Sequence, residues 1–185
     1  MTRSNSEMPG EQWVKVREYL FSRRLAVIYG VAVGILIGIG NSFLDVNFTL
    51  QPTFFGWLGA AILTVLFLHE GVHGVVGVLL GYRPILGVEP PLVYTTFKER
   101  IPRNHLMTIA LAPLLVLDAA FIGLYLLGIL KLFMDLCFAV NTIGAVGDMW
   151  IALKLLRHDA GMFVQDTKTG IEVWRLEAPR PPSNS

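Results

Sequence analysis

The stretch from Phe54 to Leu80 most constrains what this chain can fold into, because it is apolar over enough residues to cross a lipid bilayer. Its only ionisable side chains are those of His69, Glu70 and His73. Two histidines four residues apart project from one face of a helix, so both can bind one metal ion. Glu70 would then lie beside an open coordination position, where a carboxylate can take a proton from an attacking water. The pattern predicts a hydrolytic zinc site within a membrane-spanning helix.

A second interpretation of the same three residues stays open. Two histidines and a glutamate are costly on a helix face that meets lipid, so they need partners in either case. Their spacing favours a metal ion as that partner. Hydrogen bonds to neighbouring helices would satisfy the same groups without any metal.

The composition of the chain points to a membrane protein. Hydrophobic residues make up 54% of the sequence and charged residues only 16%, which is too apolar for an ordinary soluble domain. The net charge of +1 gives no reason to expect a nucleic-acid partner. The single cysteine, Cys137, excludes an internal disulfide and a cysteine-rich metal site.

Four apolar stretches are each long enough to span a bilayer, at about 25–44, 54–80, 106–130 and 132–156. We therefore expect an all-α integral membrane protein with four transmembrane helices. Residues 1–24 would form a cytoplasmic N-terminal segment, and residues 25–156 the transmembrane domain. In the cytoplasmic tail, 157–185, two alternating runs around Gly170 predict a short β-hairpin before a disordered end.

The positions of Lys and Arg predict the orientation of these spans. The first 24 residues and the loop 81–104 are rich in Lys and Arg. The loop after the first span has neither, and the connection between the third and fourth spans has only Lys131. Because cytoplasmic loops carry the excess of basic residues, both termini are expected in the cytoplasm of a multi-pass cell-membrane protein.

A catalytic zinc site needs a third protein ligand, and the intramembrane carboxylates are Asp118, Asp135 and Asp148. From the helical rise, His69 and His73 lie roughly 10–16 Å from the cytoplasmic end of their span. Asp148 lies at a matching depth of roughly 12 Å, whereas Asp118 lies deeper, at roughly 18–20 Å. Asp135 lies near the opposite surface. Depth therefore favours Asp148 as the ligand and Asp118 as a residue that supports the ligands.

Asn141 and Gly144 share a helical face with Asp148. A small residue on that face lets two helices approach closely, and the Asn141 amide could bond a substrate or a neighbouring backbone. The alternative is a glycine-mediated helix contact in which Asp148 is paired with another buried group.

These segments resemble a known family. The motif His69 to His73, the segment 111–113 (Leu-Ala-Pro) and the segment from Asn141 to Asp148 are similar to the putative zincin peptidases, relatives of the site-2 intramembrane metalloproteases. The resemblance covers roughly residues 54–174. It implies that His69, His73 and Asp148 bind zinc and that Glu70 is the catalytic base. Site-2 proteases usually carry prolines between the asparagine and the aspartate, where this chain has glycines.

The resulting hypothesis is a zinc-dependent intramembrane endopeptidase with Zn²⁺ as its cofactor. Its substrates would be membrane proteins or peptides, cut near the cytoplasmic side of the lipid bilayer. A non-catalytic membrane zinc protein that binds transmembrane helices is the main alternative. A transporter with a polar ion path is less favoured, because four spans without a repeat leave little room for alternating access.

Two further segments bear on substrate and assembly. Residues 92–97 are strand-like, and could either offer an edge to an extended substrate or form an amphipathic connector at the membrane surface. Gly30, Gly34 and Gly38 form a stripe of small residues suited to close helix packing. Packing within a monomer is favoured over homodimerisation.

Overall fold

The computed structural model describes residues 12–21, 24, 27, 28, 30, 31, 34, 52–89, 92–167 and 170–177. The helices within these residues are α2 (Pro52–Leu79), α3 (Arg103–Leu126), α4 (Lys131–Gly144) and α5 (Val146–Leu155). The strands are β1 (Gln12–Leu20), β2 (Pro84–Glu89), β3 (Leu92–Phe97), β4 (Ile101–Pro102), β5 (Phe163–Thr167) and β6 (Gly170–Glu177).

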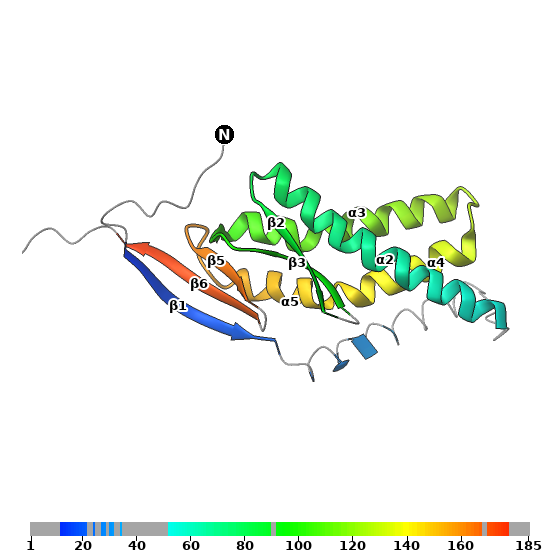
Figure 1. Cartoon of the computed structure of the whole chain (residues 1–185), viewed down its shortest axis with the longest axis horizontal. Coiled ribbons are helices and arrows are strands. Elements are labelled where there is room, and N and C mark those ends of the chain that lie inside the picture. The colour runs from blue at the N-terminus through cyan, green and yellow to red at the C-terminus, as the bar shows by residue number, and fades with distance from the viewer. Residues whose placement is uncertain are drawn as a thin grey trace, which may run out of the picture.

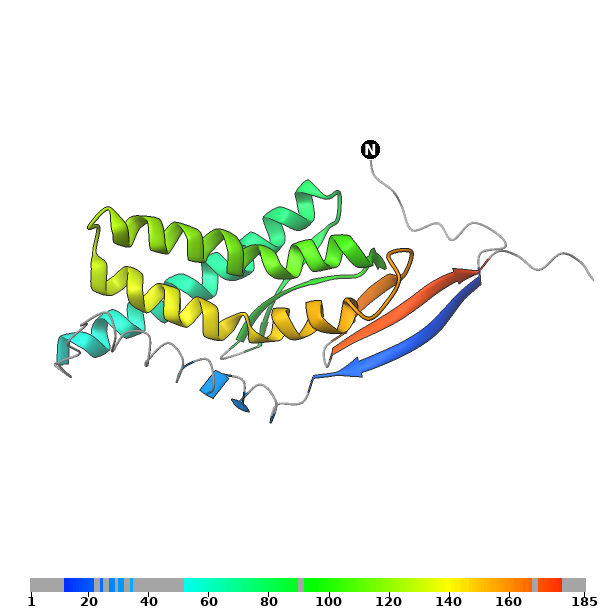
Figure 2. The same cartoon turned by 180° about the vertical axis from the view of Figure 1, so that it is seen from behind.

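The helices form an elongated bundle in which α2, α3 and α4 pack against one another (Figure 1). Their shared core contains Val65 from α2, Leu117 and Phe121 from α3, and Leu136 and Cys137 from α4. Helix α5 continues from α4 along the same side of the bundle, as the reverse view shows (Figure 2). The two helices are bent by 41° at their break.

A four-stranded antiparallel sheet, in the order β1-β6-β5-β4, lies at one end of this bundle (Figure 1). Strand β6 alternates in burial, with Ile171 and Val173 completely buried and Glu172 half-buried, as expected when one face of a strand meets a core. These residues pack in one cluster with Trp150 and Leu155 of α5. The sheet thus closes the bundle where α3 begins and α5 ends.

The remaining strands, β2 and β3, pair with each other and pack along α2. The contact depends on Gly77, because a Cβ atom at that position would lie 2.5 Å from Cε1 of Phe97 on β3. The absence of a side chain therefore lets the Phe97 ring lie directly on the helix. This packing holds β3 beside the half of α2 that carries the histidines.

The prediction of an all-α protein with four transmembrane helices and a short hairpin tail is wrong. Two β-sheets accompany the helices, and the tail hairpin, β5 and β6, belongs to the larger of them. Strand β1 lies in the N-terminal segment 1–24, for which no strand was predicted, and it pairs with β6 from Gln12↔Glu177 to Leu20↔Gly170. Charge and local pattern cannot identify such a strand, since its partner lies at the other end of the chain.

The predicted spans also change. Among the described residues, Thr53–Leu79 and Arg103–Leu126 are the two helices long and apolar enough to cross a membrane, so membrane association is possible. The expected span 132–156 is broken into α4 and α5, and would count as a third span only if this bent pair crosses as one. A physical reason for the bend is the Thr142 hydroxyl, whose single proton is shared between the Phe138 carbonyl and Asp118 Oδ2, and whose contact with that carbonyl weakens the helix one turn before its end.

The expected first span, 25–44, lies mostly outside the described residues. Two of its glycines are described: a Cβ atom on Gly30 or Gly34 would lie 3.8 Å from the side chain of Ile143 on α4. Gly38 lies outside the described residues. The two described glycines thus face α4 of the same chain.

Candidate metal centre

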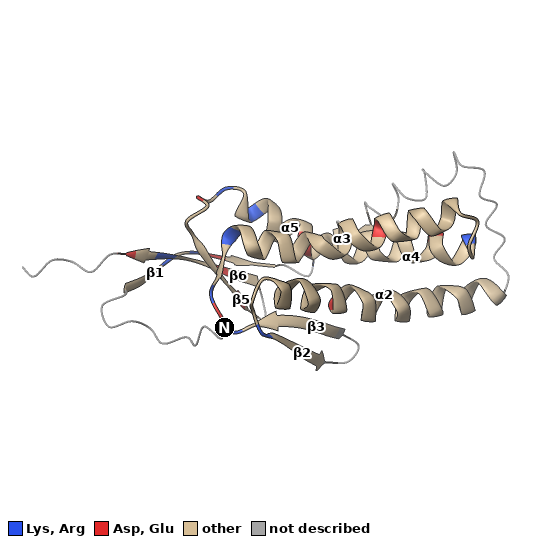
Figure 3. Ribbon diagram, turned by 90° about the horizontal axis from the view of Figure 1, so that it is seen from above, with Lys and Arg blue, Asp and Glu red and all other residues tan. Residues whose placement is uncertain are grey.

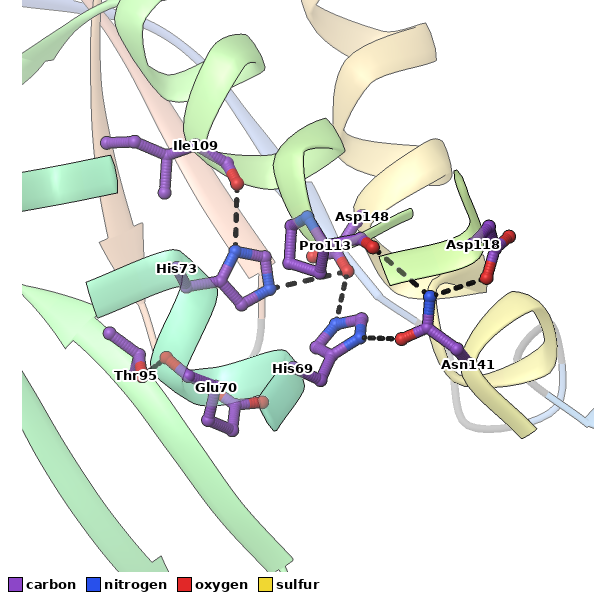
Figure 4. Close-up of polar contacts among 9 residues, drawn as sticks. All are labelled: His69, Glu70, His73, Thr95, Ile109, Pro113, Asp118, Asn141 and Asp148. Atoms are coloured by element: carbon purple, nitrogen blue, oxygen red, sulfur yellow. Dashed lines mark hydrogen bonds and ion pairs between the residues drawn. The ribbon is translucent and has the colours of Figure 1, made fainter. Parts of the chain in front are cut away.

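Helix α2 carries His69, Glu70 and His73, and turns both imidazoles toward α3, α4 and α5 (Figure 4). Both histidines are buried, and Glu70 is half-buried. One possible ligand atom from each of the three side chains lies within 4.8 Å of the others. The helical spacing that predicts a shared metal site therefore brings these groups together.

A proline on α3 prepares the hydrogen bond that orients His73. Pro113 has no N–H, so the carbonyl of Ile109, four residues earlier, lacks its usual helical donor. His73 Nδ1 lies 2.9 Å from this carbonyl oxygen. Because a carbonyl can only accept, Nδ1 carries the proton and donates. The Nε2 atom of His73 is left with a free electron pair.

Asn141 on α4 orients His69 in a similar way. Its side chain is completely buried, and Nδ2 donates to the Pro113 carbonyl at 3.2 Å and to Asp118 Oδ1 at 2.8 Å. These two acceptors fix the amide so that its oxygen faces His69 Nδ1, 2.9 Å away. His69 therefore donates from Nδ1, and its Nε2 also keeps a free electron pair.

Both Nε2 atoms converge on one oxygen of Asp148 at the start of α5 (Figure 4). Asp148 Oδ2 lies 3.0 Å from Nε2 of His69 and 3.5 Å from Nε2 of His73. With both imidazoles neutral, two electron-pair donors and a carboxylate oxygen at such distances repel one another, and either a proton on one Nε2 or a metal ion between them removes this repulsion. Ligands placed tetrahedrally about 2.1 Å from zinc are about 3.4 Å apart, so these residues fit that ion.

The other predicted carboxylate, Asp118, is linked to the His69 imidazole through the side chain of Asn141. Its Oδ1 accepts from Asn141 and its Oδ2 accepts from the Thr142 hydroxyl at 3.0 Å. Asn141 lies between Asp118 and His69, and all the hydrogen bonds of its amide are made to protein groups. Asp118, Asn141 and His69 thus form a continuous polar chain from α3 through α4 to α2.

Sequence reasoning missed two residues beside this centre. Thr95 on β3 donates to the Glu70 carbonyl at 3.0 Å, and lines a cavity of about 60 Å³ together with His73, Asp148 and Asp166. Asp166 comes from β5, and burial raises its pKa to about 6. The relevant pattern is strand alternation: β5 extends to Thr167, so Asp166 lies two residues after the buried Val164 and on the same face of the strand.

Of the comparisons with known proteins, the family match bears on this chemistry. The model of the family described as "Putative zincin peptidase" matches residues 62–163, which include α2 from the motif onward and all of α3, α4 and α5. An uncharacterized 24.7 kDa protein of Pyrococcus woesei is 26% identical over 146 residues, which cover 75% of this chain and 65% of that protein. No solved structure matches.

The family match covers more than half of the chain. The family implies a zinc metallopeptidase, and His69, Glu70 and His73 are close enough to hold a metal ion. No finding bears on a specific relation to site-2 proteases, which stays a prediction. This chain belongs to the family described as putative zincin peptidases.

Proposed function

We propose that this protein is a zinc-dependent intramembrane endopeptidase that cuts membrane-protein substrates near the cytoplasmic side of the bilayer. The observation that carries the proposal is the convergence of His69 Nε2, His73 Nε2 and Asp148 Oδ2, with Glu70 on the same helix. Two histidines and one carboxylate form a ligand set that leaves a coordination position open for chemistry. A purely structural zinc site is normally closed by a fourth protein ligand.

Each residue then has a defined task. Zinc bound by His69, His73 and Asp148 would supply Lewis acidity that activates water and polarises the scissile carbonyl. Glu70 accepts the proton of the attacking water and later donates it to the leaving amine. The carbonyl of Ile109 and the amide of Asn141 keep both imidazoles in the tautomer that presents Nε2 to the metal.

The small sheet supports a role in substrate binding. A protease binds its peptide in an extended form, and an extended peptide can pair with an open strand edge. Among the described residues β3 pairs only with β2, and the bond from Thr95 to the Glu70 carbonyl holds it beside the centre. We propose that substrate binds along this strand.

The distribution of charge supports the proposed orientation, with both termini in the cytoplasm. Lys and Arg of the described residues gather mainly at the end of the bundle that carries the larger sheet (Figure 3). The same end holds the last residue of α2, Leu79, and His69 lies about 15 Å from it along the helix. Water from the cytoplasm would have a short path to the site. A monomer is favoured, because Gly30 and Gly34 face α4 of the same chain.

Metal content and cleavage together test this function. Purified wild-type protein in detergent should contain about one zinc per chain, and Asp148→Ala should contain little. Glu70→Gln should keep the zinc but lose cleavage of single-span model substrates, since its amide cannot accept the proton. Folded wild-type protein without stoichiometric metal would contradict the proposal. Turnover by Glu70→Gln would exclude Glu70 as the base.

A further inference from the structure

Asp166 is a carboxylate beside the metal centre that the proposed chemistry does not use. It lies on β5, opposite the buried Ile171 of β6. It lines the same cavity as His73 and Asp148, between the sheet and the helices. The other side chains around this cavity are mostly apolar and include Phe97, Leu106, Ile109, Ala110 and Ile151.

The negative charge of Asp166 is not neutralised within the described part of the chain. Its hydrogen-bond donors there are uncharged, namely the Thr96 hydroxyl and the Thr167 N–H. None of the ion pairs found among the described residues includes Asp166. Although burial raises the pKa of this carboxyl to about 6, the group is mainly ionised at pH 7.

The cavity therefore combines apolar walls with one carboxylate that has no counter-ion among the residues that the structure describes. Asp148, the other carboxylate that lines it, is committed to the metal in the proposed function. A cation on an aliphatic stem is complementary to such a site, because the stem packs on apolar walls while the charged end meets the carboxylate. Lys and Arg side chains have this form, and a volume of about 60 Å³ suits the end of a side chain rather than a whole ligand.

We infer that Asp166 is a specificity-determining residue that binds a Lys or Arg side chain of the substrate close to the scissile bond. This inference rests on the proposed protease function. Membrane proteins concentrate Lys and Arg at the cytoplasmic ends of their spans. The cavity lies at the end of the bundle that is cytoplasmic in the proposed orientation. A span that is cut near this end presents a basic residue where Asp166 lies.

Substrate selection by the inactive enzyme tests the inference without turnover. Zinc-loaded Glu70→Gln protein would be mixed with a library of single-span peptides that vary among Lys, Arg, Gln and Glu at the cytoplasmic end. Bound peptides, identified by mass spectrometry, should be enriched in Lys and Arg. The enrichment should disappear when Asp166→Asn is added and remain when Asp159→Asn is added, since Asp159 is exposed in the turn before β5.

Cleavage by active enzyme gives the second measurement. Asp166→Asn should lower kcat/KM by about tenfold or more for a Lys-bearing peptide, and change it little for the matched Gln peptide. Equal binding of basic and neutral peptides, or enrichment that survives Asp166→Asn, would overturn the inference. Failure of the protease function itself would appear separately, as absent zinc or absent cleavage of every peptide. Enrichment that depends on Asp166 would still support basic-residue binding in that case.

Discussion

Replacement of Asn141 by leucine should weaken zinc binding although Asn141 is not a proposed ligand. Leucine has nearly the same size, so the buried site stays filled, but three hydrogen bonds are lost. His69 then has no acceptor for its Nδ1–H and can adopt the tautomer with the proton on Nε2. A protonated Nε2 has no free electron pair with which to bind the metal. Loss of a partner that orients a metal-binding histidine costs about 10- to 100-fold in affinity, or roughly 1.4–2.8 kcal/mol.

A second substitution at the same position separates orientation from packing. In Asn141→Asp the side chain still accepts from His69, but it can no longer donate to Asp118 and places a second carboxylate beside it. Adding Asp118→Asn restores a hydrogen bond between the two positions, in which the new amide at position 118 donates to the new carboxylate at position 141. The double variant should therefore bind zinc more tightly than Asn141→Asp alone, which is a coupling that independent sites do not show.

The assay is competition for zinc with a chromophoric chelator, on detergent-purified protein of verified fold. Ile143→Val, on the same helix but outside the polar chain, is the matched control and should bind zinc as the wild type does. Zinc affinity of Asn141→Leu within about twofold of wild type would refute the role of Asn141 in fixing His69.

Three further predictions concern the ligands, pH and packing. Elemental analysis should show that His69→Ala, His73→Ala and Asp148→Ala each lose zinc, whereas Asp118→Ala largely keeps it. Zinc lost from Asp118→Ala but kept in Asp148→Ala would mean that Asp118, and not Asp148, is the third ligand. Because burial raises the pKa of Asp166 from 3.8 to about 6, the folded state binds this proton more tightly than the unfolded state, and ionised Asp166 costs up to about 3 kcal/mol at pH 7. In thermal scans of metal-free protein, the Tm of Asp166→Asn should therefore be higher than that of the wild type at pH 7 and equal to it near pH 4. An equal Tm at pH 7 would contradict this cost. The other ionisable groups that line the cavity are His73 and Asp148. Gly77→Ala should destabilise the protein by about 1–3 kcal/mol, since its Cβ would lie 2.5 Å from the Phe97 ring; Gly59→Ala, with no atom within 4 Å, is the control and should be neutral or stabilising.

Local patterns in the sequence predict the parts of this protein that short-range geometry controls. The helical period places His69 and His73 on one face whatever surrounds them, and apolar length marks α2 and α3 as helices able to span a membrane. Alternation around Gly170 predicts the hairpin of β5 and β6. Depth along a helix favoured Asp148 over Asp118, and the structure brings Asp148 to both imidazoles, although zinc binding by Asp148 stays a prediction.

Features that join distant segments depend on the tertiary structure. The pairing of β1 with β6, the bend between α4 and α5, and the approach of Asp166 to the cavity all need partners that no local pattern identifies. Pro113 shows the difference most clearly. A proline at position 113 of a helix predicts that the Ile109 carbonyl lacks its helical donor. Only the packing of α2 on α3 brings His73 to that carbonyl. A residue's own geometry is local, whereas the partner that completes its hydrogen bonds is set by how the elements pack.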